Sequence, residues 1–249
     1  MNLIISKDAD QLSRHFADWL VSDIRNVLTT AERYTIALSG GSTPKKLFRI
    51  LREPAYARQI EWKKIHFFWG DERFVPFTDE RNNARMTFDE LLDHVPVVKE
   101  QVHIMPTGME PDEARVAYEQ VLHQYFKGEA TFDLVMLGMG PDAHTLSLFP
   151  GYPVINEQAQ WVSTFYLKEQ EMHRITLTTA VVNRAAKIAF LVAGPDKAMA
   201  LRQVLEGGRN PILFPSQVIN PASGDLSWYV DLAAAADLGP ATKRNAQRL

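Results

Sequence analysis

The 249-residue chain contains no cysteine, which excludes a disulfide framework, a thiol nucleophile and a zinc site with thiolate ligands. Positive charge is not in excess either, because 27 lysines and arginines stand against 30 aspartates and glutamates. No overall basic field is therefore available to hold nucleic acid or an anionic membrane. Long apolar runs are also missing, so we expect no membrane-spanning segment and a soluble, cytoplasmic protein. Any affinity for an anion must come from a local pocket, and nothing indicates an obligate protein partner.

The residues that are present suffice for one large core, since 46% are apolar. Apolar runs of strand length alternate with amphipathic segments of helix length. Strands are expected at 34–38, 65–69, 102–105, 132–137, 161–167, 174–178, 187–193 and 228–230. Helices are expected at 6–28, from about 44, from about 83, and at 111–126, 179–185 and 196–205. This alternation favours an α/β fold, a doubly wound, mostly parallel sheet with helices on both faces. No linker interrupts it, so we expect a single domain over 1–249, with a frayed polar tail from about Gly239.

The segment FDLVMLGMGPDAHTLSLFPG, residues 132–151, carries the clearest chemical signal. A buried-strand run ends at Gly138 and Gly140, and Asp142 and His144 follow at once. Ligands of open α/β sheets bind beyond the carboxyl ends of the strands, where we expect these two side chains. A structural alternative stays open, in which Asp142 only caps a following helix and His144 is a first-turn residue.

A second loop at the same sheet edge suits a phosphate. It offers backbone N–H groups, hydroxyls and the N-terminus of a helix. Its residues are Ser39, Gly40, Gly41, Ser42 and Thr43. The same loop could equally cap the helix and bind nothing. Neither the GxxxxGK[ST] nor the GxGxxG spacing is present, so we predict no nucleotide or nicotinamide cofactor.

Three cations lie near strand ends in the predicted fold. Arg73 either binds an oxyanion bidentately or pairs with Asp71 or Glu72 in a surface network. Lys197 falls in the first turn of a helix, where the helix dipole disfavours a cation unless an anion is nearby, so we expect a ligand there. Arg174 heads a strand, and a role in the site and a salt bridge are both open for it.

This set of residues indicates general-base catalysis. An imidazole beside a carboxylate, with cations and no cysteine, is suited to removing a proton from water. The other histidines lack metal-ligand spacing, so we predict no metal site, and no GxSxG elbow supports a serine nucleophile. We expect His144, assisted by Asp142, to activate water against the carbonyl of a small phosphorylated molecule. Arg73 or backbone N–H groups would then stabilise the developing oxyanion.

Several segments together resemble the 6-phosphogluconolactonases: SGGSTP at 39–44, GDER at 70–73, GMGPDAHTLSLFPG at 138–151, RITLT at 174–178 and GPDKAMAL at 194–201. They follow the family's order along most of the chain. The resemblance implies a sugar-phosphate-isomerase-like, Rossmann-like fold and cofactor-free hydrolysis of 6-phospho-D-glucono-1,5-lactone in the pentose phosphate pathway. It implies that His144 is the base, supported by Asp142, and that Arg73 is the active-site arginine. It implies that substrate and phosphate are held by residues 39–43, Asp71, Arg174 and Lys197.

Ala143 departs from the family pattern, which usually reads Asp-Gly-His. If this position needs a positive φ, alanine costs on the order of 1 kcal/mol and tilts His144. The rest of the segment is intact, so we expect a negative φ and no loss.

Two other functions compete with the lactonase. Glucosamine-6-phosphate deaminases carry a segment similar to DGHIAFNEP at this loop. In this chain, Leu148 or Phe149 stands in place of the glutamate that assists ring opening in those enzymes. They also show an MDEY-like segment where this chain reads GDER. A non-catalytic sugar-phosphate sensor would keep the pocket without turnover. Ala143 is the feature that favours a sensor, although no DNA-binding motif accompanies it.

Overall fold

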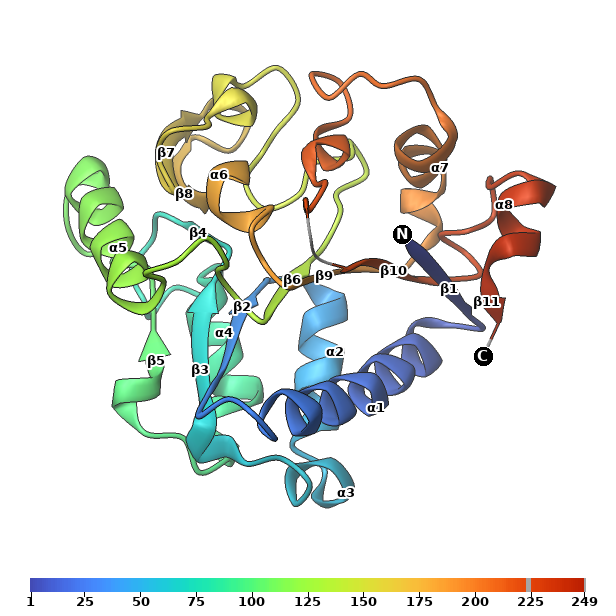
Figure 1. Cartoon of the computed structure of the whole chain (residues 1–249). Helices are drawn as coiled ribbons and strands as arrows, with labels where there is room; N and C mark the ends of the chain where they lie inside the picture. Colours follow the sequence, from blue (N-terminus) through green and yellow to red (C-terminus); the bar gives the residue numbers. More distant parts are fainter. Residues whose placement is uncertain (223–224, 249) are drawn as a thin grey trace.

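The computed structural model describes residues 1–222 and 225–248, and a parallel sheet forms their centre (Figure 1). Its strand order is β11-β1-β10-β9-β6-β2-β3-β5, and every neighbouring pair is parallel. Its strands are β1 (Asn2–Ser6), β2 (Tyr34–Leu38), β3 (Ile65–Trp69), β5 (Val102–His103), β6 (Leu134–Leu137), β9 (Lys187–Val192), β10 (Asp225–Asp231) and β11 (Gln247–Arg248). The chain leaves β2 toward β3 and leaves the adjacent β6 toward β9, so the winding direction reverses between β2 and β6. That reversal is where a doubly wound sheet opens a crevice for a ligand.

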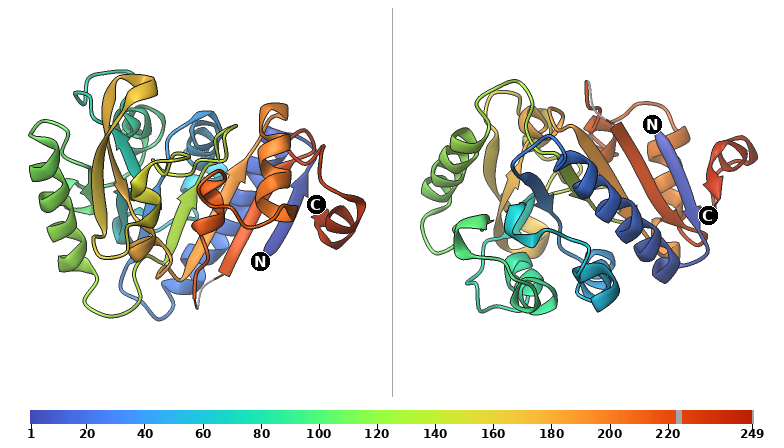
Figure 2. Two further views of the ribbon diagram at one scale, coloured as in Figure 1. Left: turned by 90° about the horizontal axis from the view of Figure 1, so that it is seen from above. Right: turned by 60° about the horizontal axis from the view of Figure 1, so that its bottom comes forward.

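Helices cover both faces of this sheet, as predicted. In Figure 1, α1 and α2 lie below the sheet and α6 and α7 above it, and Figure 2 shows the same layers from two other directions. The helices are α1 (Ala9–Val27), α2 (Ser42–Leu51), α3 (Pro54–Ala57), α4 (Asn83–Glu90), α5 (Pro111–Tyr125), α6 (Thr179–Val182), α7 (Ala198–Glu206) and α8 (Pro240–Asn245). In α1, the fourfold spacing of Leu12, Phe16, Leu20 and Ile24 buries one stripe against the sheet, and Asp8 caps the first turn. No helix in the described ranges is long and apolar enough to cross a membrane.

A smaller antiparallel sheet carries part of the ligand crevice. Its order is β4 (Asp71–Arg73), β8 (Met172–Leu177) and β7 (Val162–Leu167). The sequence predicts two of these strands but treats the third, β4, as loop. Gly70 joins the sheets, since its N–H donates to the Leu38 carbonyl at 2.8 Å and its carbonyl accepts from the Leu177 N–H at 2.8 Å. This turn places β4 beside the carboxyl ends of the parallel strands.

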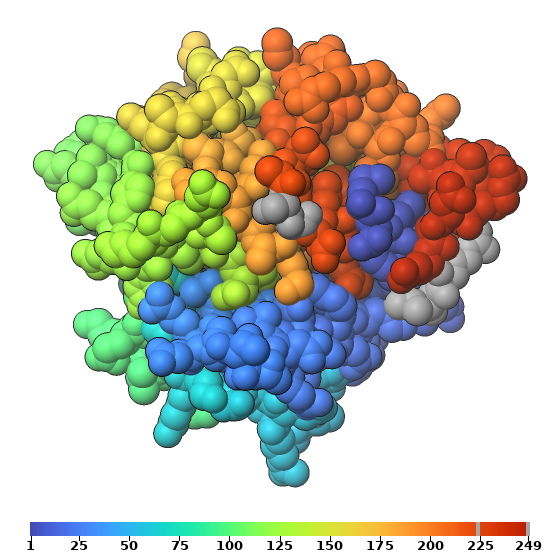
Figure 3. All heavy atoms as spheres, in the orientation of Figure 1, coloured from blue at the N-terminus to red at the C-terminus, as the bar shows by residue number. Residues whose placement is uncertain are grey.

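Both ends of the chain differ from the expectation. The run at residues 2–6, where the sequence predicts no strand, is β1, because pairing with β10 buries it. The tail after Gly239 is not frayed. It forms α8 and then β11, which pairs with β1, so the first and last strands of the chain lie side by side at one edge of the sheet (Figures 1 and 3). The last central strand, β10, has seven residues instead of the expected three, because it lies between β1 and β9.

Two histidines pack at the other end of the sheet, away from the crevice. His66 shares a 3.0 Å hydrogen bond with the Tyr125 hydroxyl, and His103 stacks on Phe68 with ring centroids 4.6 Å apart. Burial lowers the pKa of His103 to about 4, and the nearby positive charge of Arg33 also contributes. Both rings therefore pack against other aromatic side chains of this part of the fold.

His103→Phe is expected to make the fold less sensitive to acid. The unfolded chain takes up a proton at His103 near pH 6.5, whereas the folded chain resists it down to about pH 4. The free energy of unfolding is therefore unaffected by this titration above pH 6.5. It decreases as pH falls from 6.5 toward 4, because only the unfolded chain takes up the proton there. Because the ring is only half-buried, we expect a difference of roughly 1–2 kcal/mol between pH 7 and pH 5. Urea unfolding at both pH values checks this, and equal acid sensitivity in the variant would contradict it.

Candidate active site

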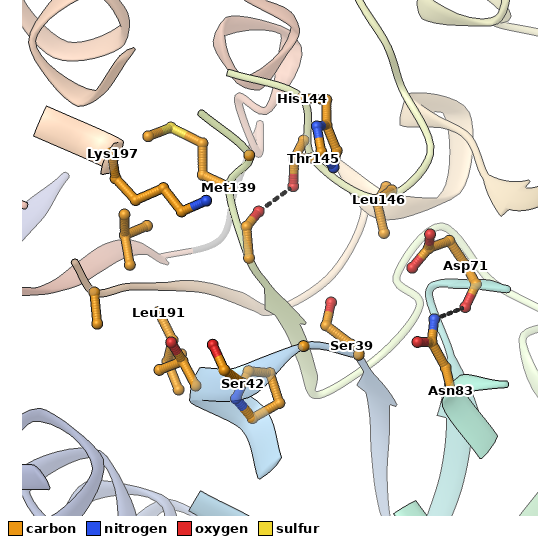
Figure 4. Close-up of a pocket in the computed structure, with 18 of the residues that line it drawn as sticks. Ser39, Ser42, Asp71, Asn83, Met139, His144, Thr145, Leu146, Leu191 and Lys197 are labelled. Carbon is orange, nitrogen blue, oxygen red and sulfur yellow. Dashed lines mark hydrogen bonds between the residues drawn. The ribbon is translucent and has the colours of Figure 1, made fainter. Parts of the chain in front are cut away.

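A pocket of about 270 Å³ opens at the carboxyl ends of β2, β6 and β9 (Figure 4). The loops at these three strand ends contribute to its wall, together with β4, β8 and the start of α4. The sequence-predicted residues that line it are Ser39, Gly40, Gly41, Ser42, Thr43, Asp71, Arg73, His144, Arg174 and Lys197. The remaining candidate, Asp142, lies behind His144 and contacts it. The structure thus brings together the side chains that the sequence placed at this edge.

The His144 imidazole is held by Asp142. The ring Nδ1 lies 2.5 Å from Asp142 Oδ1, and the ring stacks on Phe149 with centroids 4.2 Å apart. Burial raises the pKa of Asp142, but the hydrogen bond and charge of His144 outweigh this effect, so the pKa lies below its ordinary value. An ionised Asp142 accepts a hydrogen bond from Nδ1–H and so keeps that proton on Nδ1, which leaves the lone pair on Nε2 free to accept a proton from water.

The helix-capping alternative for Asp142 is wrong. No helix follows it within residues 138–151, which form turns closed by a bridge between Thr145 and Leu148. The Thr145 hydroxyl donates to the Gly138 carbonyl at 2.8 Å, which folds the loop back on the end of β6. Among the described residues, Asp142 is hydrogen-bonded to the backbone N–H and the ring of His144, so these interactions serve His144.

The expectation of a negative φ at Ala143 is also wrong, because its φ is +62°. Its carbonyl accepts from the backbone N–H and the hydroxyl of Ser216 at 2.9 and 2.8 Å, and its N–H donates to the Gly140 carbonyl at 3.0 Å. These three hydrogen bonds hold the left-handed conformation. The contact between His144 and Asp142 forms nevertheless, so the alanine has not displaced the imidazole.

Ala143→Gly is expected to leave the stability of the fold within about 1 kcal/mol of wild type. Relief of the left-handed strain, about 1–2 kcal/mol, offsets the 0.4–1 kcal/mol or so that glycine gives to the unfolded chain and the loss of one buried methyl group, about 0.8 kcal/mol. The control is Ala189→Gly, which removes an equally buried methyl group from β9. Ala189 has no positive φ, so this variant relieves no strain and should destabilise the fold. Urea unfolding measures both, and equal destabilisation by the two variants would rule the strain out.

Asp71 and Arg174 form a buried ion pair on the pocket wall. Arg174 Nη2 donates to Asp71 Oδ2 at 2.8 Å, and the Ser147 hydroxyl donates to the same oxygen at 2.7 Å. Burial raises the pKa of Asp71, but the charges of Arg174 and Arg73 outweigh it, so the pKa lies below its ordinary value. Of the two alternatives left open for Arg174, the salt bridge is present, and the side chain also lines the pocket.

Arg73 is not paired with the carboxylates beside it in sequence. Its guanidinium donates to the side-chain oxygen of Asn83 and, at 3.2 Å, to the Arg81 carbonyl. In the described part of the chain, no carboxylate lies within 4.0 Å of it. Glu72 instead accepts from the first N–H groups of α4, at Asn83 and Ala84, at 2.8 and 2.9 Å. Burial raises the pKa of Glu72 to about 7. The surface network expected as one alternative is therefore absent, and the Arg73 charge stays available to a ligand.

Lys197 reaches the pocket from the turn before α7, and Figure 4 shows its side chain extending into the pocket. Its amine pairs with Asp196 Oδ2 at 2.9 Å. This pairing supplies a negative charge near the helix start, so the position of Lys197 no longer requires an anionic ligand. The lysine remains a cation at the pocket wall, with its amine free to make further hydrogen bonds.

The glycine loop presents the N-terminus of α2 to the pocket. Gly41 has φ +110° and no side chain caps the helix, so its first N–H groups have no intrahelical acceptor. The Ser39 hydroxyl is used internally, donating to the Met136 carbonyl at 2.9 Å. An anion is the natural partner for such a helix end. No three His, Asp or Glu side chains of the described residues cluster to hold a metal ion.

A doubly wound α/β sheet with a His–Asp pair and three cations at its crevice defines a class of enzymes acting on small anionic substrates. The chain matches the family described as glucosamine-6-phosphate isomerases/6-phosphogluconolactonase over residues 7–228, and it belongs to this family.

Relatives of known sequence and structure agree with this assignment. The chain is 37% identical over 236 residues to the 6-phosphogluconolactonase of Nostoc sp., covering 93% of this chain and 95% of the relative. The structure of the 6-phosphogluconolactonase from Trypanosoma cruzi superposes with a TM-score of 0.83 at 27% identity, covering 95% and 96% of the two chains. A monomeric glucosamine-6-phosphate deaminase reaches a TM-score of 0.82 at 19% identity, with 95% and 100% covered. The last match shows a shared fold only, so the fold alone does not distinguish a lactonase from a deaminase.

Proposed function

We propose that this protein hydrolyses 6-phospho-D-glucono-1,5-lactone to 6-phospho-D-gluconate, the lactonase step of the pentose phosphate pathway. The observation that carries the proposal is the His144–Asp142 pair at the pocket. The same pocket holds the open N-terminus of α2 and Arg73, whose guanidinium is hydrogen-bonded to an uncharged side chain. The curated relatives named 6-phosphogluconolactonase, which match over most of both chains, support the same activity.

In the proposed reaction, His144 Nε2 removes a proton from water while the water oxygen forms a bond to C1 of the lactone. Asp142 stabilises the resulting imidazolium. The carbonyl oxygen becomes an oxyanion, to which Arg73 donates. The bond between C1 and the ring oxygen then breaks, and the ring oxygen takes the proton from His144. The phosphate lies near the N-terminus of α2 and Lys197, and Asp71 and Arg174 shape the wall between them.

A deaminase-like isomerase is disfavoured by the residues around the base. Leu148 and Phe149 stand where the deaminases carry a glutamate, and both are buried. Phe149 stacks on the His144 ring and leaves no carboxylate there to assist ring opening. The sensor alternative loses its main support, because Ala143 has not displaced His144 from Asp142.

The direct test generates the lactone in place from glucose 6-phosphate with a dehydrogenase and measures 6-phosphogluconate formation above the spontaneous rate. Acceleration by the wild-type protein supports the lactonase. No acceleration, with 6-phosphogluconate still raising the melting temperature, would favour the sensor. Conversion of glucosamine 6-phosphate would favour the isomerase.

Lys197→Ala is expected to raise KM by about 10- to 100-fold with a smaller change in kcat, because a charge-assisted hydrogen bond to the phosphate is lost in ground state and transition state alike. Steady-state kinetics measure the split. Lys46→Ala is the matched control, since this half-exposed lysine pairs with Asp10 outside the pocket. A fall in kcat at unchanged KM would place Lys197 at the reacting centre instead.

A further inference from the structure

We propose that Asn83 is a positioning residue that aims the Arg73 guanidinium into the pocket without neutralising it, and that residue 40 is glycine because Asn83 fills the space of a side chain there. The inference rests on the proposed lactonase function and deepens it. Neither Asn83 nor this role of Gly40 follows from the sequence pattern.

Asn83 is held by hydrogen bonds at its side-chain oxygen, its side-chain amide nitrogen and its backbone N–H. The residue is 2% exposed, and its side-chain amide donates to the Asp71 carbonyl at 2.9 Å. Its backbone N–H donates to Glu72 Oε1 at 2.8 Å, and its side-chain oxygen accepts from Arg73 Nη1. One buried residue is therefore tied to three successive residues of β4, and its two side-chain hydrogen bonds, to Asp71 and Arg73, set its rotamer. Figure 4 shows Asn83 beside Asp71 at the pocket wall.

The chemistry of an amide suits this position better than that of a carboxylate. A carboxylate beside Arg73 would form an ion pair and neutralise the charge that a substrate oxyanion needs. The Asn83 oxygen and the Arg81 carbonyl both orient the guanidinium through neutral acceptors. Preorganised donors stabilise a developing oxyanion without reorganising during the reaction, so holding Arg73 in place matters most in the transition state.

Gly40 interlocks with the same amide. A Cβ built on Gly40 would lie 1.8 Å from Asn83 Oδ1 and 2.4 Å from its Cγ. Gly40 has no positive φ, so the requirement concerns space rather than backbone conformation. The loop that offers N–H groups to an anion and the helix that supports Arg73 therefore meet at one contact, and a side chain at residue 40 would push Asn83 away from Arg73.

The main test is a double-mutant cycle of Asn83→Ala and Arg73→Ala in the lactonase assay, with folding checked by melting temperature. Asn83→Ala should lower kcat/KM by about 10- to 100-fold, mainly through kcat. In the Arg73→Ala background it should change activity by less than about twofold, because Asn83 acts through Arg73. Additive losses in the two backgrounds, or wild-type activity in Asn83→Ala, would overturn the proposal.

Gly40→Ala provides a second test with Asn83 intact, which also decides the matter if Asn83→Ala fails to fold. Its loss of kcat/KM should match that of Asn83→Ala and should vanish in the Arg73→Ala background; a loss of equal size in both backgrounds would overturn the proposal. If the wild-type protein does not hydrolyse the lactone, the proposed function fails by itself. In that case calorimetric binding of 6-phosphogluconate in the same cycle tests the positioning, and coupling supports it whereas additivity overturns it.

Discussion

His144→Ala is expected to lower kcat by on the order of 10²- to 10⁴-fold, toward the spontaneous rate, while the protein stays folded. His144 is the one histidine that lines the described pocket, and no cysteine exists to replace it as a base. Its ring is partly exposed, hydrogen-bonded to Asp142 and stacked on Phe149, and it lies outside the main hydrophobic core, so its removal should change stability little. The coupled lactonase assay measures kcat, and urea unfolding measures stability.

The matched control for this prediction is His94→Ala. His94 is exposed and its ring nitrogen contacts the Asp89 carbonyl, far along the chain from the crevice loops. It should keep wild-type activity. Asp142→Asn should retain more activity than His144→Ala, because the imidazole remains while its orientation and charge stabilisation weaken. A fully active His144→Ala protein would remove the base assignment and with it the proposed mechanism.

The sequence locates the candidate site well because its signal is local. Each of the crevice loops follows an apolar run that ends at a glycine, and parallel strands carry their carboxyl ends to one edge. The strands at 34–38 and 65–69 agree with the structure to the residue. His144, Arg73 and Lys197 therefore meet in the pocket although they are far apart in sequence.

What the sequence misses depends on tertiary contacts. Asp71–Arg73 is too short to show a strand period, and it becomes β4 only because β8 pairs with it. The positive φ of Ala143 is imposed by hydrogen bonds from Ser216, a residue 73 positions away in the chain. The support of Arg73 by Asn83 could have been suspected only from the polar start of α4, since asparagines at helix starts ordinarily serve as caps. Asn82 does serve as that cap, which leaves Asn83 free for the site.

Asp71→Ala is expected to destabilise the fold by about 3–5 kcal/mol, because it leaves the Arg174 guanidinium buried without its partner. Arg174 and Asp71 are 3% and 6% exposed, so solvent cannot replace the lost interaction. The pKa of Asp71 lies below its ordinary value of 3.8 in the folded protein. The stabilising effect of the carboxylate is therefore complete above that value and disappears as pH falls below it. Urea unfolding should show the full difference from wild type at pH 7 and a smaller one near pH 3.

An ion pair with an exposed carboxylate provides the contrast. Asp112→Ala removes a carboxylate that is 80% exposed and pairs with Arg115, which also pairs with Glu119, so stability should change by less than about 1 kcal/mol. If Asp71→Ala were equally mild, the buried pair would not stabilise the wall of the pocket, and water would have to reach Arg174.

The double variant Asp71→Ala/Arg174→Met separates the structural from the functional role of the pair. Removing both charges eliminates the unpaired guanidinium, so most of the lost stability should return. Activity should not return with it, because both side chains line the pocket and the charge of Asp71 also acts on Arg73. Recovery of stability with kcat/KM still reduced would assign the pair to the site. Recovery of both would make it a purely structural ion pair, and the anion would then be bound by Arg73, Lys197 and the N-terminus of α2 alone.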